Sequence, residues 1–467
     1  QAYHPLGKVH RRSLPLAFAL LALLLSSPKL HAQTNWNETL KAVASDRAAD
    51  DEFGYSVAID GNYAIVGARY EDEDASGQDS LNNAGSAYIF ERNATTGTWS
   101  EVQKIVASDR ASGDRFGSSV AISGNYAIVG AYLEGEDASG QNTKTIAGSA
   151  YIFERNATNG NWSEVKKIVA SDRDSFYRFG YSVSISGDYA IVGSNFRSIP
   201  RPPDLGGTPL DPQASQSVLG TTSSNPSSSA YLFERNATTG TWSEVQKIVA
   251  SDQDNDDGFG NSVSISGNYA IVGARFEDGD TSGQDSLRDA GSAYLFERNA
   301  NNGDWSEVQK IVASDRDSLD RFGSSVSISG NYAIVGARQE NEDASGQDSL
   351  NAAGSAYLFE RDNATGTWSE VQKIVASDRS QNDLFGRSVS IIGDYAIVGA
   401  HREDEDASGQ DSLPDAGSAY LFERNATTGT WSEVHKIVAS DRDGDDLFGN
   451  SVSISGNYAI VGAVRED

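Results

Sequence analysis

The residues best suited to chemistry lie in an acidic loop that recurs along the chain. In the copy that runs from Asp72 to Asp79, oxygen-bearing side chains stand at the first, third and fifth positions, and a glycine follows them. Calcium takes about six to eight oxygen ligands, and a glycine permits the sharp turn that folds alternate side chains around one point. The candidate calcium ligands are Asp72, Asp74, Ser76, Asp79, Asp278, Asp280, Ser282, Asp285, Asp343, Ser345, Asp348, Asp404, Asp406, Ser408 and Asp411.

These loops have a second interpretation, because each lacks the bidentate glutamate that closes an EF-hand loop. Asn341 replaces the first aspartate in one copy, and Gly135 and Asn142 weaken another. A solvated acidic loop would have the same composition without binding an ion. The sequence leaves both interpretations open, and calcium is the one cofactor that it suggests.

Catalytic motifs are absent from the rest of the sequence. The chain has no cysteine, and only His401 and His435 lie beyond the first 33 residues. There is no Gly-x-Ser-x-Gly turn and no phosphate-binding loop, and every carboxylate pair occupies a repeated position. We therefore expect that the protein is not an enzyme.

The net charge of −29 argues against two classes of partner. A surface this acidic repels nucleic acid and anionic lipid. We expect an extracellular protein or glycan ligand, and no nucleic acid.

Phe-Gly pairs divide the chain into repeats. Six intervals separate them, and five of these are 63 residues long, whereas the third is 80. The pairs begin at Phe53, Phe116, Phe179, Phe259, Phe322, Phe385 and Phe448. Each complete unit contains an alternating segment, a Gly-Asn or Gly-Asp turn, the apolar run Tyr-Ala-Ile-Val, a second apolar segment and a polar segment that begins with tryptophan. This content predicts an all-β, seven-bladed β-propeller of four-stranded antiparallel blades.

The two ends of the repeat array are offset. Residues 36–43 resemble a fourth strand, and the unit that begins at Phe448 stops after its second strand. We expect the last blade to be incomplete, to be completed in part by the N-terminal strand, and to be followed in the natural chain by a third strand. The expected blades are residues 53–106, 116–169, 179–249, 259–312, 322–375, 385–438, and 448–467 with 36–43, within a propeller of residues 33–467.

Residues 1–32 have the features of a signal peptide. Basic residues precede an apolar stretch from Leu14 to Leu25, which is short for a membrane span of about 20 residues. We expect a secreted or cell-surface protein with no membrane insertion after cleavage; an uncleaved anchor is the alternative. Asn-x-Thr/Ser sequons would make it a glycoprotein in a eukaryotic secretory pathway, and they lie at Asn37, Asn93, Asn156, Asn161, Asn236, Asn363 and Asn425.

Phe-Gly followed about 13 residues later by Val-Gly-Ala resembles the FG-GAP repeat of integrin α-chain propellers and of bacterial and protist surface proteins. The resemblance covers residues 36–467 and implies a propeller used in cell adhesion. Two features depart from that pattern. The proline of the motif is missing from every unit, and a two-residue turn stands where integrin repeats carry their calcium loop.

Two functions remain open. The first is a non-catalytic secreted or cell-surface binding and adhesion propeller, stabilised by calcium if the acidic loops bind it. The alternative is an accessory propeller of a larger extracellular hydrolase or lyase. One insert, residues 195–228, breaks the symmetry of the repeats and is either a binding loop or a low-complexity excursion. We interpret the seven tryptophans as packing residues between blades.

Overall fold

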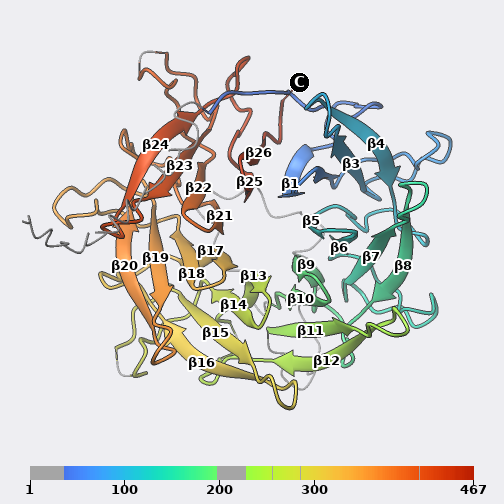
Figure 1. Cartoon of the computed structure of the whole chain (residues 1–467), viewed down its shortest axis with the longest axis horizontal. Helices are drawn as coiled ribbons and strands as arrows, with labels where there is room; N and C mark the ends of the chain where they lie inside the picture. The colour runs from blue at the N-terminus through green and yellow to red at the C-terminus, as the bar shows by residue number, and fades with distance from the viewer. Residues whose placement is uncertain (1–35, 197–227, 255, 284, 410, 467) are drawn as a thin grey trace, which may run out of the picture. The chain divides into compact units, whose positions relative to one another are not determined.

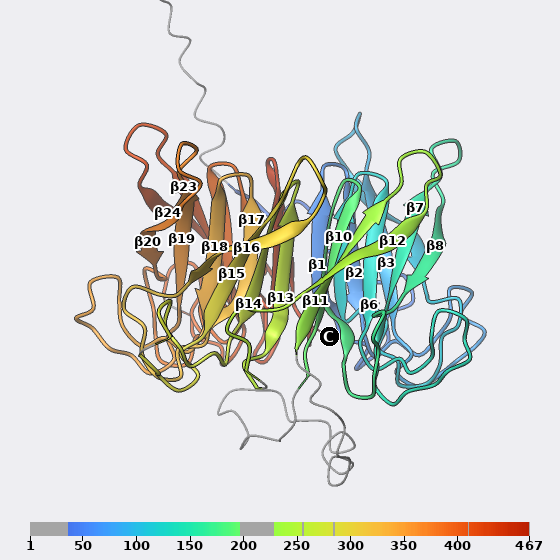
Figure 2. The same ribbon diagram turned by 90° about the horizontal axis from the view of Figure 1, so that it is seen from below.

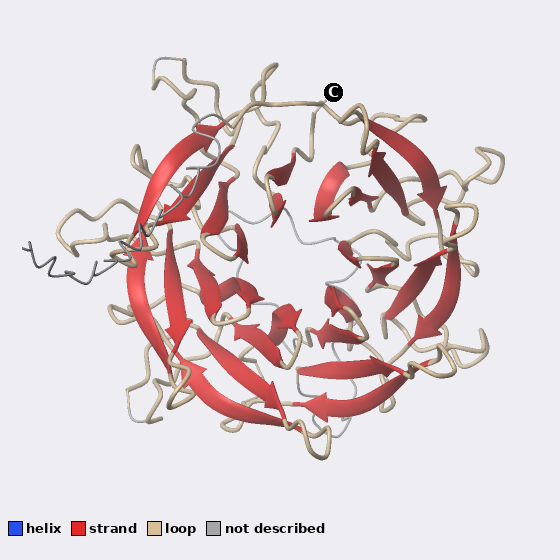
Figure 3. Ribbon diagram, viewed as in Figure 1, coloured by secondary structure: helices blue, strands red, loops and turns tan. Residues whose placement is uncertain are grey.

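The regular secondary structure of the described residues consists of β-strands, as the repeat predicts (Figure 3). The computed structural model describes residues 36–196, 228–254, 256–283, 285–409 and 411–466. Over these ranges there are 26 strands, and no helix is long and apolar enough to cross a membrane. The expected signal peptide (1–32) and most of the insert (197–227) lie outside the described residues.

Within the described ranges, six antiparallel sheets have four strands each and a seventh sheet has two. The first three sheets contain β1 (Phe53–Asp60), β2 (Tyr63–Ala68), β3 (Ser86–Arg92), β4 (Trp99–Ile105); β5 (Ser119–Ser123), β6 (Tyr126–Ala131), β7 (Ser149–Arg155), β8 (Trp162–Ile168); and β9 (Phe179–Ser186), β10 (Tyr189–Ser194), β11 (Ser229–Arg235), β12 (Trp242–Ile248). The next two contain β13 (Phe259–Ser266), β14 (Tyr269–Ala274), β15 (Ser292–Arg298), β16 (Trp305–Ile311); and β17 (Phe322–Ser329), β18 (Tyr332–Ala337), β19 (Ser355–Arg361), β20 (Trp368–Ile374). The last two contain β21 (Ser388–Ile392), β22 (Tyr395–Ala400), β23 (Ser418–Arg424), β24 (Trp431–Ile437); and β25 (Ser451–Ser455), β26 (Tyr458–Gly462).

The sheets surround a common axis within residues 37–467, so the unit is a β-propeller (Figure 1). The first strand of each sheet is innermost, and the tryptophan-bearing fourth strand is outermost. Antiparallel pairing sends the ends of the second strands and the starts of the first strands to the same face. The long acidic loops and the linkers between blades therefore share that face, at the lower edge of Figure 2.

The blades pack through apolar side chains from both faces of each sheet. Between the fourth and fifth blades, Leu295 and Ile311 pack against Phe322 and the side chains around it. Trp368 of the fifth blade meets Tyr269 of the fourth edge to face, with ring centroids 6.3 Å apart, and is 2% exposed. The interpretation of the tryptophans as packing residues agrees with this geometry.

The two-stranded sheet closes the ring between the sixth and first blades. Backbone N–H groups of β1 donate to serine hydroxyls of β25: Val57 to Ser451 at 3.0 Å and Ile59 to Ser453 at 3.2 Å. The same kind of hydrogen bond joins complete blades, since Ile328 N–H donates to the Ser264 hydroxyl at 3.1 Å. The ring is therefore closed by the contacts that hold neighbouring blades together elsewhere.

The predicted count of seven four-stranded blades is not confirmed, because the described residues form six such blades and one smaller sheet. The expected strand at residues 36–43 is also wrong, since this segment contains no strand. Among the described residues, β26 pairs with β25 alone. The N-terminal segment nevertheless contacts the last unit through its side chains. Lys41 Nζ lies 2.6 Å from both Asp441 and Glu466, and Glu38 accepts a hydrogen bond from Ser440 N.

Glycines allow neighbouring blades to touch through their backbones. Gly291 has φ +87°, and a Cβ built on it would lie 2.0 Å from the carbonyl oxygen of Phe322 in the next blade. Gly330, in a hairpin turn, has φ +57° and open space where its Cβ would stand. The positive φ favours glycine at both positions, but only at Gly291 would a side chain also collide with the next blade.

This difference gives a stability test. We expect Gly330→Ala to cost about 1–2 kcal/mol, the strain of a left-handed residue. Gly291→Ala should cost clearly more, because the methyl group also forces two backbones apart. Chemical denaturation of the two variants measures the difference. Equal costs would mean that the backbone contact between blades does not limit the packing.

Candidate functional site

The acidic loops are organised by their own hydrogen bonds. The Asp74 carboxylate accepts hydrogen bonds from the backbone N–H of Gln78 and from both the N–H and the hydroxyl of Ser76, at 2.8–3.1 Å. These bonds, led by that of Gln78, hold the pKa of Asp74 well below its usual range. The same aspartate–serine pair occurs in the other predicted copies, at Asp280 and Ser282, Asp343 and Ser345, and Asp406 and Ser408.

An arginine from the following linker holds the two ends of each loop together. Arg110 donates to the carbonyl oxygens of Asp72 at 2.6 Å and Asp79 at 3.0 Å, and its side chain is largely buried. The Asp72 carboxylate turns instead to the backbone N–H of Asn83, at 2.6 Å. The equivalent arginines are Arg316 beside Asp278 and Asp285, Arg379 beside Asp348, and Arg442 beside Asp404 and Asp411.

The described structure does gather carboxylates, but the predicted ligands are not among them. Four groups of three acids have ligand atoms within 4.8 Å of one another, namely Asp46, Glu71, Glu73; Asp109, Glu134, Glu136; Asp315, Glu340, Glu342; and Asp378, Glu403, Glu405. Sequence reasoning missed these residues, although each recurs at a fixed position of the repeat. Calcium binding by the predicted loops stays a prediction.

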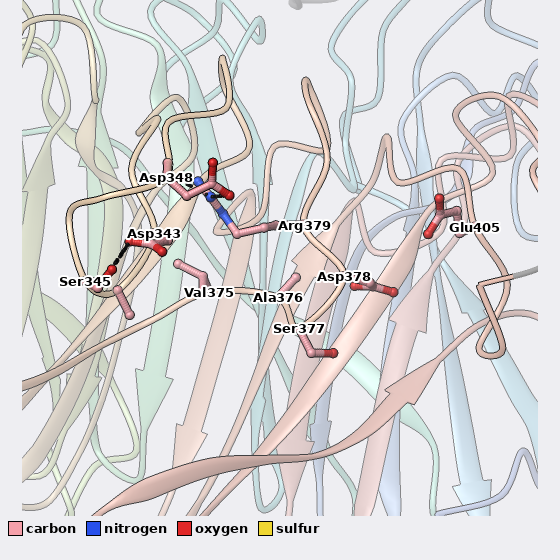
Figure 4. Close-up of a pocket in the computed structure, with 10 residues that line it drawn as sticks. Asp343, Ser345, Asp348, Val375, Ala376, Ser377, Asp378, Arg379 and Glu405 are labelled. Carbon is pink, nitrogen blue, oxygen red and sulfur yellow. Dashed lines mark hydrogen bonds and ion pairs between the residues drawn. The ribbon is translucent and has the colours of Figure 1, made fainter.

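An open groove of about 750 Å³ separates one acidic loop from the next blade (Figure 4). Asp343, Ser345 and Asp348 line one side. The linker that contains Asp378 lines the other, together with Glu405 of the next acidic loop. An equivalent groove of about 650 Å³ lies beside Asp74 and Asp109. Carboxylates of the loops and of the acid groups thus face shared, solvent-open grooves on the rim.

Each acid group also contains a buried lysine and tyrosine. In the fifth blade, Lys373 Nζ lies 2.7 Å from both Asp315 and Glu340, and the Tyr357 hydroxyl donates to Asp315 at 2.8 Å. Tyr357 is fully buried and Lys373 nearly so. The sixth blade repeats the set with Asp378, Glu403, Tyr420 and Lys436. This network ties the linker to strands three and four of each complete blade.

A further buried carboxyl, that of Asp320, has a raised pKa. Asp320 caps the turn at Asp317, accepting its N–H at 2.5 Å, and is 1% exposed. Burial, with the nearby charge of Glu340, raises the pKa of Asp320 to about 8. Its equivalents have pKa values raised in the same way, to about 6 for Asp51 and Asp446, about 7 for Asp114 and Asp383, and about 8 for Asp257.

Arginines gather around the axis on the same face. They occupy the positions before Phe-Gly, after Phe-Gly and after the second strand, and comprise Arg69, Arg115, Arg178, Arg275, Arg321, Arg338 and Arg387. Residues at the position after Phe-Gly contact one another between neighbouring blades around the axis. Arg387 donates to Asn450 at 3.0 Å, and Asn450 donates to the carbonyl oxygen of Tyr55, also at 3.0 Å.

Tyr181 shows how closely these arginines approach one another. Burial alone would raise its pKa, but Arg275, Arg387, Arg178 and Arg338 outweigh burial and lower it. These arginines belong to four different blades, so the tyrosine that interacts with all of them must lie near the axis. Sequence reasoning missed this cluster and noted only Arg197 and Arg201 of the insert, which lie outside the described residues.

Aromatic rings stand between the axial arginines. The Arg69 guanidinium lies 3.6 Å from the centre of the Tyr55 ring, and its Nε pairs with Glu52 at 2.5 Å. Tyr132 and Tyr181 meet edge to face with ring centroids 5.6 Å apart. The centre of this face thus combines permanent positive charge with aromatic surfaces and hydroxyl groups.

The family model for the FG-GAP repeat matches this chain seven times, over residues 36–90, 99–153, 162–204, 242–296, 305–359, 368–422 and 431–467. The matches cover most of the chain and coincide with the propeller. The chain belongs to the FG-GAP repeat family. The predicted resemblance to FG-GAP repeats is confirmed, whereas likeness to integrins in particular stays a prediction. No curated protein matches the chain.

Solved structures similar to this FG-GAP propeller are distant in sequence, and each is 12% identical to it. A periplasmic gluconolactonase from Pseudomonas aeruginosa covers 86% of each chain with a TM-score of 0.44. A putative 6-phosphogluconolactonase from Bacteroides fragilis covers 83% of this chain and 85% of its own with a TM-score of 0.47. A protein from Lactobacillus plantarum covers 83% and 86% with the same TM-score.

Two of these three proteins are named as lactonases, which contradicts the expectation that this protein is not an enzyme. That expectation rested on the absence of nucleophile and phosphate-loop motifs. Identity of 12% and TM-scores below 0.5 assign no activity to this chain.

The protonated aspartates predict how stability depends on pH. Because the native pKa of Asp320 exceeds its unfolded value, the folded state binds more protons between about pH 4 and pH 8. The stability that this group contributes is therefore greatest below about pH 4 and falls progressively as the pH rises to about 8. We expect Asp320→Asn, which keeps the acceptor for Asp317 N–H, to flatten that fall by on the order of 1 kcal/mol or more.

Denaturation midpoints of wild type and Asp320→Asn at pH 5 and pH 9 make the comparison. Asp50→Asn, which changes an exposed aspartate of another inter-blade loop, is the control and should follow the wild type. A variant with the full wild-type pH dependence would mean that Asp320 is ionised in the folded protein.

Proposed function

We propose that the axial face of this propeller binds an anionic carbohydrate and serves extracellular hydrolase or lyase chemistry on it. The observation that carries the proposal is the cluster of axial arginines in a protein whose net charge is −29. Guanidinium groups keep their charge at every physiological pH and pair with carboxylates through two parallel hydrogen bonds. A negatively charged protein that concentrates positive charge at one point is adapted to hold an anion there.

Tyrosines support a carbohydrate as the anion. Tyr55, Tyr132 and Tyr181 are half-buried among the arginines and combine flat apolar rings with hydroxyl groups. Such rings stack on sugars, and their hydroxyl groups hydrogen-bond with them. A uronic-acid oligosaccharide offers both a carboxylate and a sugar ring, so it matches the two kinds of side chain present.

The accessory propeller of a larger extracellular enzyme is the form of this function that we favour. Nothing in the comparisons supports an adhesion role. The axial cluster would bind a carbohydrate, and this binding does not require that the protein attach to a cell. The protein would hold an acidic polysaccharide while chemistry occurs on it. Export through the secretory pathway remains part of the proposal.

Binding of hexagalacturonate, measured by titration calorimetry, tests the proposal, with uncharged cellohexaose as the control ligand. We expect Arg338→Gln/Arg387→Gln to lose at least tenfold in affinity, since each charge-assisted hydrogen bond contributes about 1.5–3 kcal/mol. Arg338→Lys/Arg387→Lys keeps the charge and should recover part of the affinity. Lys144→Gln/Arg288→Gln removes the same charge from the exposed rim and should bind as the wild type does.

Equal binding of the two oligosaccharides, or a loss of affinity in the rim control as large as in the axial variant, would overturn the proposal. Melting temperatures of all variants separate lost binding from lost folding. An assay for new reducing ends and for unsaturated products, with gluconolactone as a further substrate, shows whether the propeller itself catalyses a reaction. Turnover by the isolated chain would replace the accessory role with an enzymatic one.

Calcium at the rim is a second proposal, supported by the grooves in which Asp74, Ser76 and Asp79 face the linker carboxylate of Asp109. A cation that binds only the folded state raises the melting temperature by mass action. We expect millimolar calcium to raise it relative to chelator, and Asp74→Ala/Asp280→Ala/Asp406→Ala to abolish that rise. Identical wild-type melting curves with calcium and with chelator would leave the loops as solvated surface.

A further inference from the structure

His401 directly follows the second strand of the sixth blade, at a position whose side chains lie near the axis in other blades. In the first blade, Arg69 at this position lies 3.6 Å from the ring centre of Tyr55, which follows the Phe-Gly pair of the same blade. In the second blade, Tyr132 meets Tyr181, which follows the Phe-Gly pair of the next blade. Side chains at this position thus reach the residues that follow the Phe-Gly pairs of their own blade and of the next.

Two axial arginines adjoin His401 in this arrangement. Arg387 follows the Phe-Gly pair of the same blade, and Arg338 holds the position of His401 in the fifth blade. The charges of Arg387, Arg338 and Arg402 act on the imidazole, and the first two also act on Tyr181. Because His401 is only 6% exposed, little solvent screens these charges. The imidazole therefore lies in a field of positive charge.

The first blade shows how such charge is balanced elsewhere at the axis. There Glu52, the residue before Phe-Gly, pairs with Arg69 at 2.5 Å. The residue at the position of Glu52 is Arg321 in the fifth blade and Leu384 in the sixth. On the side of the seventh blade, the residue after Phe-Gly is the uncharged Asn450. None of these positions around His401 supplies an acid.

The carboxyl groups on the adjoining loops interact with other partners. Asp383, on the linker before the sixth blade, caps a turn of that linker. Glu403, on the acidic loop, pairs with Lys436 at 2.9 Å. Asp415, at the end of that loop, interacts with Arg402. The charges that shift the pKa of the imidazole are all positive.

The imidazole is therefore neutral and can accept a proton. Burial, followed by Arg387, Arg338 and Arg402, lowers the pKa of His401 well below its usual range. Its Nδ1 has no hydrogen-bond partner among the described residues. In the tautomer that carries its hydrogen on Nε2, a proton added at Nδ1 breaks no hydrogen bond. Burial and the guanidinium charges are what oppose that proton, and an anion held by the arginines offsets the second of them.

We infer that the axial site takes up a proton at His401 together with its anion, so that binding tightens as the pH falls. This inference rests on the function proposed above and specifies how that site is regulated. Solvent supplies the proton. Because the two equilibria are linked, protonation strengthens anion binding by the same factor as the anion strengthens protonation. The carboxylates of a uronic-acid ligand stay ionised above about pH 5, so the ligand does not contribute to the effect.

Binding of hexagalacturonate, measured by titration calorimetry at pH 5.5 and pH 7.5, tests the inference. The wild type should bind roughly tenfold more tightly at pH 5.5, since the pKa of the imidazole returns toward its usual value of about 6.5 in the complex. Comparison of two buffers with different ionisation enthalpies at pH 5.5 should show uptake of about one proton. His401→Asn introduces the residue that the third blade carries here, Asn195. This variant should lose the proton uptake and bind with nearly equal affinity at the two pH values.

His435→Gln is the matched control, because His435 lies on the outer strand β24 and Gln372 stands at its position in the fifth blade. Asp383→Asn is a second control, which removes a linker carboxyl whose pKa is raised to about 7. Both variants should keep the pH dependence of the wild type. Melting temperatures at each pH show whether the variants are folded, and the proton uptake of the wild type needs no variant.

The outcomes separate this inference from the proposed function. Wild-type binding without proton uptake, or proton uptake and pH dependence that persist in folded His401→Asn, would overturn the inference and leave the proposed function intact. Failure of the wild type to bind the oligosaccharide at either pH would overturn both.

Discussion

The fold depends on backbone-to-backbone contact between neighbouring blades. At Gly67, Gly85 and Gly117, an added Cβ would stand 2.0–2.2 Å from a carbonyl oxygen of the adjoining blade. Gly85 also forms an isolated parallel bridge to Phe116, and equivalent bridges bind Phe179, Phe322, Phe385 and Phe448 to the blade before them. No side chain fits in these contacts. The Phe-Gly and Val-Gly elements that define the repeat are therefore the places where blades meet most closely.

This close contact brings the inner strands together and crowds charge at their ends. The seven innermost strands lie around one axis, so residues that differ from the repeat pattern and are far apart in the sequence become neighbours in space. Arginines that stand alone in their own repeats form one cluster there, and they lower the pKa of Tyr181 despite its burial. Farther from the axis the same geometry stacks linker, second strand and fourth strand. This stacking produces the lysine–carboxylate–tyrosine network of the complete blades. In the sequence of the third unit, Arg197, which lies outside the described residues, stands at the position of the network's glutamate.

The seventh position shows how much of a blade depends on its central strands. Residues 37–44 keep the side-chain contacts of a fourth strand through Glu38 and Lys41, yet they form no strand. A fourth strand obtains its backbone hydrogen bonds from the third strand, and no third strand pairs with residues 37–44 among the described residues. The ring still closes, because closure runs through the inner strand β25 and its serine hydroxyls.

The sequence by itself determined the strands, the order of the blades and the family, because these depend on local periodicity and on a repeated motif. It also indicated that the N-terminal segment lies with the last unit, since Lys41 aligns with the fourth-strand lysines. Only the tertiary structure decided which acids gather. The predicted ligands Asp72 and Asp74 lie close in sequence, but local hydrogen bonds and Arg110 hold them, whereas Asp46 and Glu71 converge from separate segments. The axial cluster likewise joins residues such as Arg178 and Arg387, which are more than 200 positions apart. Spacing along the chain reports local turns, whereas groups of charges in a ring arise from the closure of distant segments around an axis.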